Sequence, residues 1–179
     1  MIAPKGFEKV FHSQRAHELR RFIRPIHSIT LDAGSGTGLI TRYLSGYVIA
    51  CDLNLWNLQR AKTRVVADFV QCDLSALPFR TIFDNIVSSE VLEHISQPEK
   101  AVREFRRVLK PRGRFVGSVP SRSPIWKFRS LLSQTHPHSE PFHNNYSRSR
   151  LGSLLSTGFR NIRIVPAVLG MAWFFEAKD

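Results

Sequence analysis

The sequence has little cysteine, few acidic side chains and no long hydrophobic run. Its 179 residues include only two cysteines, Cys51 and Cys72, and no Cys/His cluster has the spacing of a zinc site. No apolar run approaches the roughly 20 residues of a membrane-spanning helix, and the N-terminus lacks the apolar core of a signal peptide. We therefore expect a cytoplasmic protein with free thiols and no metal centre.

Negative charge is scarce. Asp and Glu together number 14, against 26 Lys and Arg, which gives a formal net charge of +12. Such an excess favours anionic partners: RNA, an acidic lipid surface or a phosphorylated substrate. The densest basic cluster runs from Arg103 to Arg114, and a second group of arginines and a lysine flanks residues 120–147. Because a charge run is also the usual composition of a solvated face, nucleic-acid binding and peripheral membrane contact both stay open.

Apolar periodicity predicts one α/β domain over residues 1–179. The length fits a single core, and 42% of the residues are hydrophobic, as in ordinary globular proteins. Strand-like and helix-like segments alternate as far as Val119, which predicts a parallel sheet with crossover helices. A helix over 148–156 and two strands, over 159–165 and 170–177, complete the pattern.

A glycine-rich turn is the most informative segment. Asp32-Ala33-Gly34-Ser35-Gly36-Thr37-Gly38 joins a predicted strand over 26–31 to a predicted helix over 39–44. Glycines at alternate positions permit a tight turn and a close approach by a ligand, and this is where a doubly wound sheet binds a nucleotide cofactor. The spacing is neither the dinucleotide fingerprint nor a P-loop. Since Asp32 would repel a pyrophosphate, it suits a ligand with a positive charge.

Two further acids follow predicted strands. Residues 47–52 form a short apolar run ending in Asp52, and residues 69–74 contain Asp73 near their end. An acid at the tip of the second strand accepts hydrogen bonds from ribose hydroxyls in Rossmann-like sheets. Asp52 would also serve as the cap of a helix over 54–62, because Asp favours that position. The two roles are compatible.

These segments, in this order, resemble the motifs of class I S-adenosylmethionine-dependent methyltransferases. Residues 32–38 resemble the first motif, and Phe83-Asp84-Asn85-Ile86-Val87-Ser88-Ser89-Glu90-Val91-Leu92-Glu93-His94-Ile95 resembles the fourth strand and following loop of the small-molecule branch, which includes the ubiquinone and menaquinone biosynthesis enzymes. Residues 98–110 have apolar side chains at helical spacing, residues 110–113 are expected to end this helix before a strand over 114–119, and residues 109–114 match a Leu-Lys-Pro-x-Gly-Arg signature. The resemblance covers about residues 29–120.

The resemblance implies a Rossmann-like three-layer sandwich: a mostly parallel seven-stranded sheet with an antiparallel C-terminal hairpin. It implies S-adenosylmethionine as the cofactor and S-adenosylhomocysteine as the product. An N-terminal helical segment over 1–27 would lie above the cofactor, with Arg15 meeting the methionine carboxylate, although a helix packed on the sheet with solvated arginines is the plainer alternative. The expected cofactor-binding residues are Arg15, Asp32, Ala33, Gly34, Ser35, Gly36, Gly38, Asp52, Leu53, Asp73, Leu74, Ser89 and Glu90.

Residues 120–147 are expected to form a substrate lid, because long loops at this edge of the sheet are commonly functional. A general base is needed only if the acceptor must lose a proton. His94 and His143 are the candidates since histidine titrates near neutrality, with Tyr146 a weaker one. The alternatives are that His94 fixes its loop, and that His143 belongs to a flexible polar segment.

Three functions compete. The first is methyl transfer to a small-molecule acceptor, either anionic or membrane-associated, as residues 83–95 favour. The second is RNA or protein methylation, which the net charge favours, although the chain lacks an Asn-Pro-Pro-Tyr motif and a catalytic cysteine pair. The third is a non-catalytic cofactor-binding partner protein.

Overall fold

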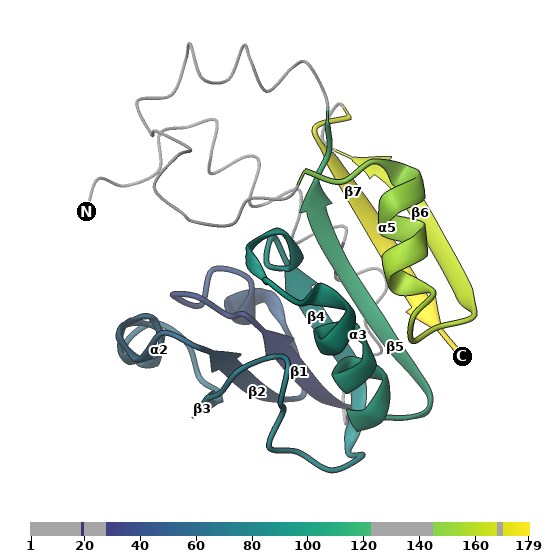
Figure 1. Ribbon diagram of the computed structural model, residues 1–179. Helices are drawn as coiled ribbons and strands as arrows, with labels where there is room; N and C mark the ends of the chain where they lie inside the picture. The colour runs from purple at the N-terminus through teal and green to yellow at the C-terminus, as the bar shows by residue number, and fades with distance from the viewer. Residues whose placement is uncertain (1–18, 20–27, 123–144, 168–169) are drawn as a thin grey trace, which may run out of the picture.

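The computed structural model describes residues 19, 28–122, 145–167 and 170–179 (Figure 1). In these residues seven strands form one sheet in the order β3-β2-β1-β4-β5-β7-β6. Strands β1 to β5 pair in parallel, whereas β7 runs antiparallel to both β5 and β6. The predicted sheet is therefore confirmed. The strands are β1 (Ile29–Ala33), β2 (Tyr47–Asp52), β3 (Asp68–Gln71), β4 (Phe83–Ser89), β5 (Leu109–Pro120), β6 (Asn161–Ala167) and β7 (Ala172–Lys178).

The described helices are short and cap or cover the sheet. They are α2 (Leu55–Lys62), α3 (Pro98–Val108) and α5 (Arg148–Leu155), with single 3-10 turns η1 (Thr41–Tyr43) and η2 (Leu92–His94). Figure 1 shows α3 and α5 side by side over one face of the sheet. The apolar stripe of α3 is fully buried, as its helical spacing predicts: it consists of Ala101, Val102, Phe105 and Val108.

Hydrophobic cores lie on both faces of the sheet. Because successive strand residues point to opposite faces, Ile86 and Phe115 pack in the larger core under α3 and α5. Their neighbours Val87 and Val116 pack in a second cluster with Leu19 and Ile40. Apolar side chains on both faces are what a three-layer α/β sandwich requires.

Some predicted boundaries are wrong. The helix expected over 39–44 is only the turn η1, and the first strand ends at Ala33 rather than Leu31. Residues 26 and 27, which were expected to start that strand, lie outside the described ranges. Residues 110–113 were expected to separate α3 from the next strand, but α3 ends at Val108 and β5 starts directly at Leu109. This junction tightens at Arg112, whose φ of 63° lies in the left-handed region. In the described part of the chain, every helix is too short or too polar to cross a membrane.

Candidate active site

The glycine-rich turn folds back over the end of β2. The backbone N–H groups of Gly34 and Ser35 both donate to the carbonyl of Cys51, at 2.8 and 2.9 Å. Gly34, Gly36 and Gly38 all adopt positive φ, at 79°, 54° and 82°. Residues with a Cβ atom strongly disfavour positive φ, so the path of the backbone itself requires the alternating glycines.

Gly34 and Gly36 have different surroundings. A Cβ atom on Gly34 would lie 2.5 Å from Cγ2 of Val91, whereas one on Gly36 would meet nothing within 4 Å. Gly34 therefore packs the turn against the loop after β4, and Gly36 faces open space. Between them, the Ser35 hydroxyl is buried and makes no hydrogen bond. A buried hydroxyl beside open space is suited to a polar ligand group, because burial without a partner costs free energy.

Asp52 connects the turn to α2. Its Oδ2 accepts from the Gly36 N–H at 2.8 Å, and its Oδ1 accepts from the Asn54 N–H at 2.8 Å and the Asn57 amide at 3.4 Å. A carboxylate offers about four acceptor positions, so this half-exposed side chain retains capacity for a hydroxyl donor. The cap of α2 is Asn54, whose side chain accepts from the Trp56 N–H. The alternative of Asp52 as the cap is therefore wrong.

The neighbouring strand ends provide an apolar surface and another acid. The Leu53 side chain is 69% exposed, while its carbonyl accepts from the Gln71 side chain at 2.9 Å. Asp73 is exposed and accepts from the Ser75 N–H at 2.7 Å, which fixes the turn after β3. The Leu74 side chain is buried in the core. Leu53 can thus contact a flat ring, whereas Leu74 can contribute only its backbone.

Asp32 and Ala33 lie beneath the turn rather than on its surface. Both are buried, and Asp32 Oδ2 accepts from the Thr41 hydroxyl at 2.6 Å. Burial, with a smaller contribution from the charge of Asp52, raises the pKa of Asp32 to about 6, although the Thr41 hydrogen bond opposes the shift. Asp32 therefore holds the turn to η1, and its buried carboxylate would influence a ligand only through its charge.

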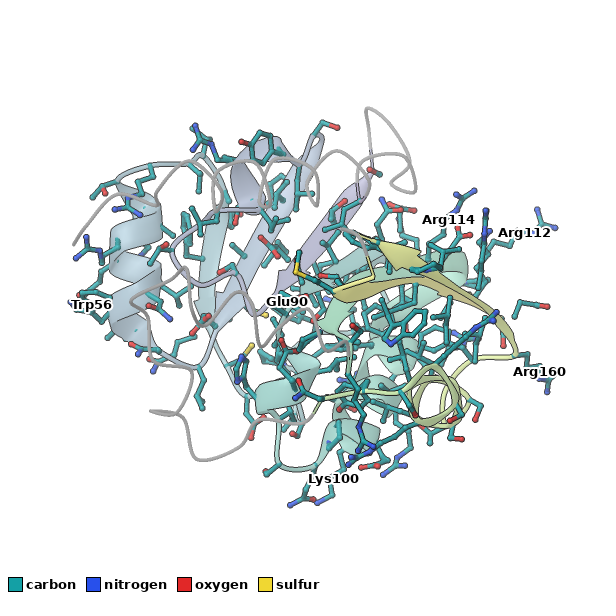
Figure 2. All side chains as sticks on the ribbon, turned by 90° about the horizontal axis from the view of Figure 1, so that it is seen from above. Trp56, Glu90, Lys100, Arg112, Arg114 and Arg160 are labelled. Atoms are coloured by element: carbon teal, nitrogen blue, oxygen red, sulfur yellow. The ribbon has the colours of Figure 1, made fainter. Side chains whose placement is uncertain are left out.

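The end of β4 brings the predicted residues Ser89 and Glu90 to the same edge. The hydroxyls of Ser89 and Ser118 lie 3.0 Å apart, and the Glu90 N–H donates to the Ser118 carbonyl at 2.9 Å. Glu90 has a φ of 56°, a sparsely populated conformation for a side-chain-bearing residue. Such strain concentrates at functional sites, and Figure 2 shows Glu90 near the middle of the molecule, at the end of the sheet.

His94 and Glu93 follow on η2. The His94 side chain is 36% exposed, and its Nε2 lies 3.9 Å from Oε1 of Glu93, which is only 1% exposed. The His94 N–H donates to the Val91 carbonyl and closes the turn. The structure thus places an accessible imidazole at the edge that carries the glycine turn. Sequence reasoning missed the burial of Glu93, because this turn has no amphipathic periodicity to indicate it.

Tyr146 is in the interior. Its hydroxyl donates to the Leu92 carbonyl at 3.2 Å, and its carbonyl accepts from the Trp173 indole at 3.1 Å. Burial, then the charge of Glu93, raises the pKa of Tyr146 to about 12. A buried, neutral phenol is a poor proton acceptor, and its hydrogen bond to the Leu92 carbonyl on η2 gives Tyr146 a positioning role.

Several sequence predictions concern residues beyond those described. Arg15, His143, the segment 1–27 except Leu19, and residues 123–144 of the expected lid lie outside the described ranges. Within the ranges that are described, no three His, Cys, Asp or Glu side chains are arranged to hold a metal ion. Cys51 and Cys72 are free thiols there. Sequence reasoning also missed Thr41 and Val91, which contact the turn only because the fold brings them there.

The sequence matches a known protein family and is similar to curated methyltransferases. Residues 31–117 match the family described as "Methyltransferase domain". A malonyl-[acyl-carrier protein] O-methyltransferase from Herminiimonas arsenicoxydans is 30% identical over 160 residues, covering 86% of this chain and 61% of the relative. The ubiquinone/menaquinone biosynthesis C-methyltransferase UbiE from Escherichia fergusonii is 36% identical over 161 residues, covering 79% and 59%.

Solved structures show the same fold. An S-adenosylmethionine-dependent methyltransferase from Thermotoga maritima superposes with a TM-score of 0.80 at 16% identity, covering 96% of this chain and 93% of that one. Fold, motifs and the match over residues 31–117 together support a class I S-adenosylmethionine-dependent methyltransferase domain, similar to those of the small-molecule branch, as the sequence predicts. The chain spans about three fifths of the length of the two curated relatives above.

Proposed function

We propose that this protein transfers a methyl group from S-adenosylmethionine to a small-molecule acceptor, either anionic or membrane-associated. The observation that carries the proposal is the geometry around Asp52. This acid, the open side of Gly36 and the exposed Leu53 lie together where β1 and β2 end. Their positions match the nucleoside-binding edge of a Rossmann-like sheet.

The residues present fit this cofactor. Asp52 would accept a hydrogen bond from a ribose hydroxyl, and Leu53 would pack against the adenine. Asp73 and the backbone of Leu74 would contact the adenine amino group. The glycine turn would let the methionine portion approach the backbone, where the buried Ser35 hydroxyl lacks a partner. The charge of Asp32, with its raised pKa, would favour the cationic ammonium and sulfonium beside it.

The cofactor supplies an already activated methyl group. The protein therefore has to orient the acceptor, exclude water and, where the acceptor carries a proton, remove it. His94 would perform the last task, and this is supported by its accessible ring on η2, just after β4 and next to Glu93. Glu90 and Ser89 line the same edge and would help to position the methionine portion or the acceptor.

The character of the acceptor is inferred from the relatives. Their names concern malonyl groups on a carrier protein and quinones, which are respectively anionic and lipophilic. The basic cluster from Arg103 to Arg114 argues less for RNA than its sequence suggests, because four of its side chains form ion pairs within the protein. They are Arg106 with Asp179, Arg107 with Glu104, Lys110 with Asp84 and Arg114 with Glu176.

A radiolabel experiment tests the proposal. The purified protein is incubated with methyl-labelled S-adenosylmethionine and separate lipid, small-metabolite, RNA and protein fractions of a cell extract. We expect label in the lipid or small-metabolite fraction, and its loss when Asp52 is replaced by alanine. Label in RNA, or in protein side chains rather than in an acyl group carried by a carrier protein, would support the second function instead. Tight cofactor binding without label in any fraction would favour a non-catalytic partner protein.

A further inference from the structure

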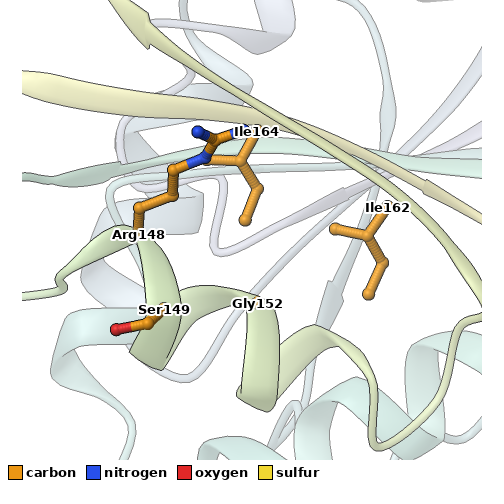
Figure 3. Close-up of a pocket in the computed structure, with 5 residues that line it drawn as sticks. All are labelled: Arg148, Ser149, Gly152, Ile162 and Ile164. Atoms are coloured by element: carbon orange, nitrogen blue, oxygen red, sulfur yellow. The ribbon is translucent and has the colours of Figure 1, made fainter.

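A groove separate from the cofactor edge lies between α5 and β6. Its volume is about 620 Å³, and it is lined by Arg148, Ser149, Gly152, Ile162 and Ile164 (Figure 3). The two isoleucines form an apolar floor that continues into the larger core. Gly152 leaves space above the isoleucines unfilled: a Cβ at that position would lie 3.8 Å from Cδ1 of Ile164, at ordinary contact distance. The missing side chain therefore helps to keep the groove open.

The segment that builds the groove carries charge of one sign. Residues 145–167 contain four arginines and no aspartate or glutamate. Arg148 lines the groove and is exposed, and Arg150 and Arg160 are exposed nearby in the chain. Figure 2 shows Arg160 projecting outward at the turn between α5 and β6. Arg148 at the edge of the groove, with the exposed arginines near it in the chain, is called here the basic rim. An apolar floor beside this rim is complementary to a surface with anionic headgroups above hydrocarbon.

The aromatic side chains of this segment disfavour RNA as the occupant. Single-stranded RNA is bound mainly by stacking its bases on exposed aromatic rings. The segment has only two aromatic residues, Tyr146 and Phe159, and both are buried, at 1% and 3% exposure. The accessible apolar surface is aliphatic, and half-buried isoleucines suit acyl chains better than bases.

The groove also begins near the cofactor edge. The Tyr146 N–H donates to the carbonyl of Pro120 at the end of β5, and α5 starts two residues later at Arg148. The end of α5 that carries Arg148 is therefore next to the carboxyl ends of the strands. A membrane bound at the groove would lie beside the edge where the acceptor has to enter.

We infer that the α5–β6 groove docks the protein onto an anionic lipid bilayer, with Arg148 at the headgroups and the isoleucine floor against acyl chain. Membrane docking is a property separate from methyl transfer and does not depend on it. Only the further idea that docking brings a membrane-borne acceptor to the site rests on the proposed function.

Vesicle flotation without cofactor tests the inference. The full chain is mixed with vesicles of phosphatidylcholine alone or of phosphatidylcholine with phosphatidylglycerol. We expect binding only to the mixed vesicles, and an affinity about fivefold lower for Arg148→Ala, the fold-change equivalent to the roughly 1 kcal/mol of one arginine near an anionic surface. Arg80→Ala removes the same charge from the exposed β3–β4 connection and should leave binding unchanged.

The apolar floor needs its own variants. Gly152→Leu should fill the groove and weaken vesicle binding several-fold without changing the charge, whereas Gly152→Ala should retain both fold and binding. If the leucine variant is unstable in thermal melts, Ser149→Glu adds a negative charge beside Arg148 at the groove mouth and should weaken vesicle binding relative to Ser149→Gln, and a glutamate there is compatible with a helix N-terminus.

Three outcomes would overturn the inference. Equal binding to neutral and mixed vesicles, or none to either, would exclude anionic docking. Undiminished binding by a folded Gly152→Leu variant would exclude the groove. Tighter binding to single-stranded RNA, lost in Arg148→Ala, would assign the basic rim to nucleic acid. Because no cofactor is present, these results are independent of whether the protein transfers methyl groups.

Discussion

The carboxylate of Asp52 accepts a hydrogen bond from the backbone N–H of Gly36 at 2.8 Å. This bond joins the end of β2 to the glycine turn that follows β1, and the same carboxylate holds the start of α2 through Asn54. The acid expected to bind ribose is therefore also the group that shapes the turn around it. Cofactor affinity and the conformation of the turn should depend on this one side chain.

Replacing Asp52 with alanine should weaken binding of S-adenosylmethionine by roughly 1.5–3 kcal/mol, the usual value for a hydrogen bond to a charged group. Asp52→Asn keeps one acceptor oxygen and should lose less. Calorimetric titration gives both affinities, and thermal melts separate binding from unfolding. Unchanged affinity in a folded alanine variant would remove the ribose assignment.

Gly34 and Gly36 should respond differently to alanine. At Gly34 the new Cβ would lie 2.5 Å from Val91 and would also be strained at φ 79°. Overpacking and left-handed strain together predict a loss of about 2–5 kcal/mol in unfolding free energy. At Gly36 nothing is within reach, so only about 1–2 kcal/mol of strain is expected. Denaturant unfolding measures both, and equal losses would contradict the packing argument.

The raised pKa of Asp32 predicts a pH dependence of stability. Burial moves this pKa from 3.8 to about 6, so the folded state holds the proton more tightly than the unfolded chain does. Protonation therefore stabilises the fold below pH 4, and this contribution, roughly 3 kcal/mol, is lost as the pH rises to 6.

The variant Asp32→Asn isolates that contribution. Its amide oxygen can still accept the Thr41 hydrogen bond, but the side chain cannot ionise. We expect it to be more stable than the wild type at pH 7, with the difference in unfolding free energy shrinking toward pH 4. Parallel stability curves for the two proteins across this range would show that Asp32 does not titrate as its burial implies.

His94→Ala should lower turnover by about 10²–10⁴-fold if the imidazole removes a proton from the acceptor, while cofactor affinity stays nearly unchanged. Ser96→Ala, an exposed change on the same loop, serves as the matched control. Steady-state assays on an identified acceptor give the comparison. A fully active His94→Ala enzyme would leave the residue with a structural role in its turn.

Sequence patterns predicted strands and helices well where the burial of apolar side chains alone determines their positions. The boundaries of β2 agree with its apolar run from Tyr47 to Asp52, and the buried face of α3 agrees with its helical spacing. The junction at Leu109 was missed because Lys110 and Arg112 resemble a polar loop. In the fold they lie at the start of β5, where Lys110 pairs with Asp84 and Arg112 adopts a positive φ.

Contacts across the fold were the hardest part to predict. Asp32 looks like a surface acid in sequence, yet it lies under the turn because Thr41, nine residues later, donates to it. Tyr146 looks like an exposed polar aromatic, yet its hydroxyl reaches the backbone of Leu92. Neither pairing has a local signature, since both partners are brought together only when the strands assemble.

Calorimetric titration of the purified protein with S-adenosylmethionine and S-adenosylhomocysteine tests the central claim most directly. The site at the ends of β1 and β2 predicts saturable one-to-one binding of both compounds, weakened for both by Asp52→Ala. Absence of binding to either compound by the folded protein would contradict the account, because the glycine turn would then be a structural feature without its cofactor.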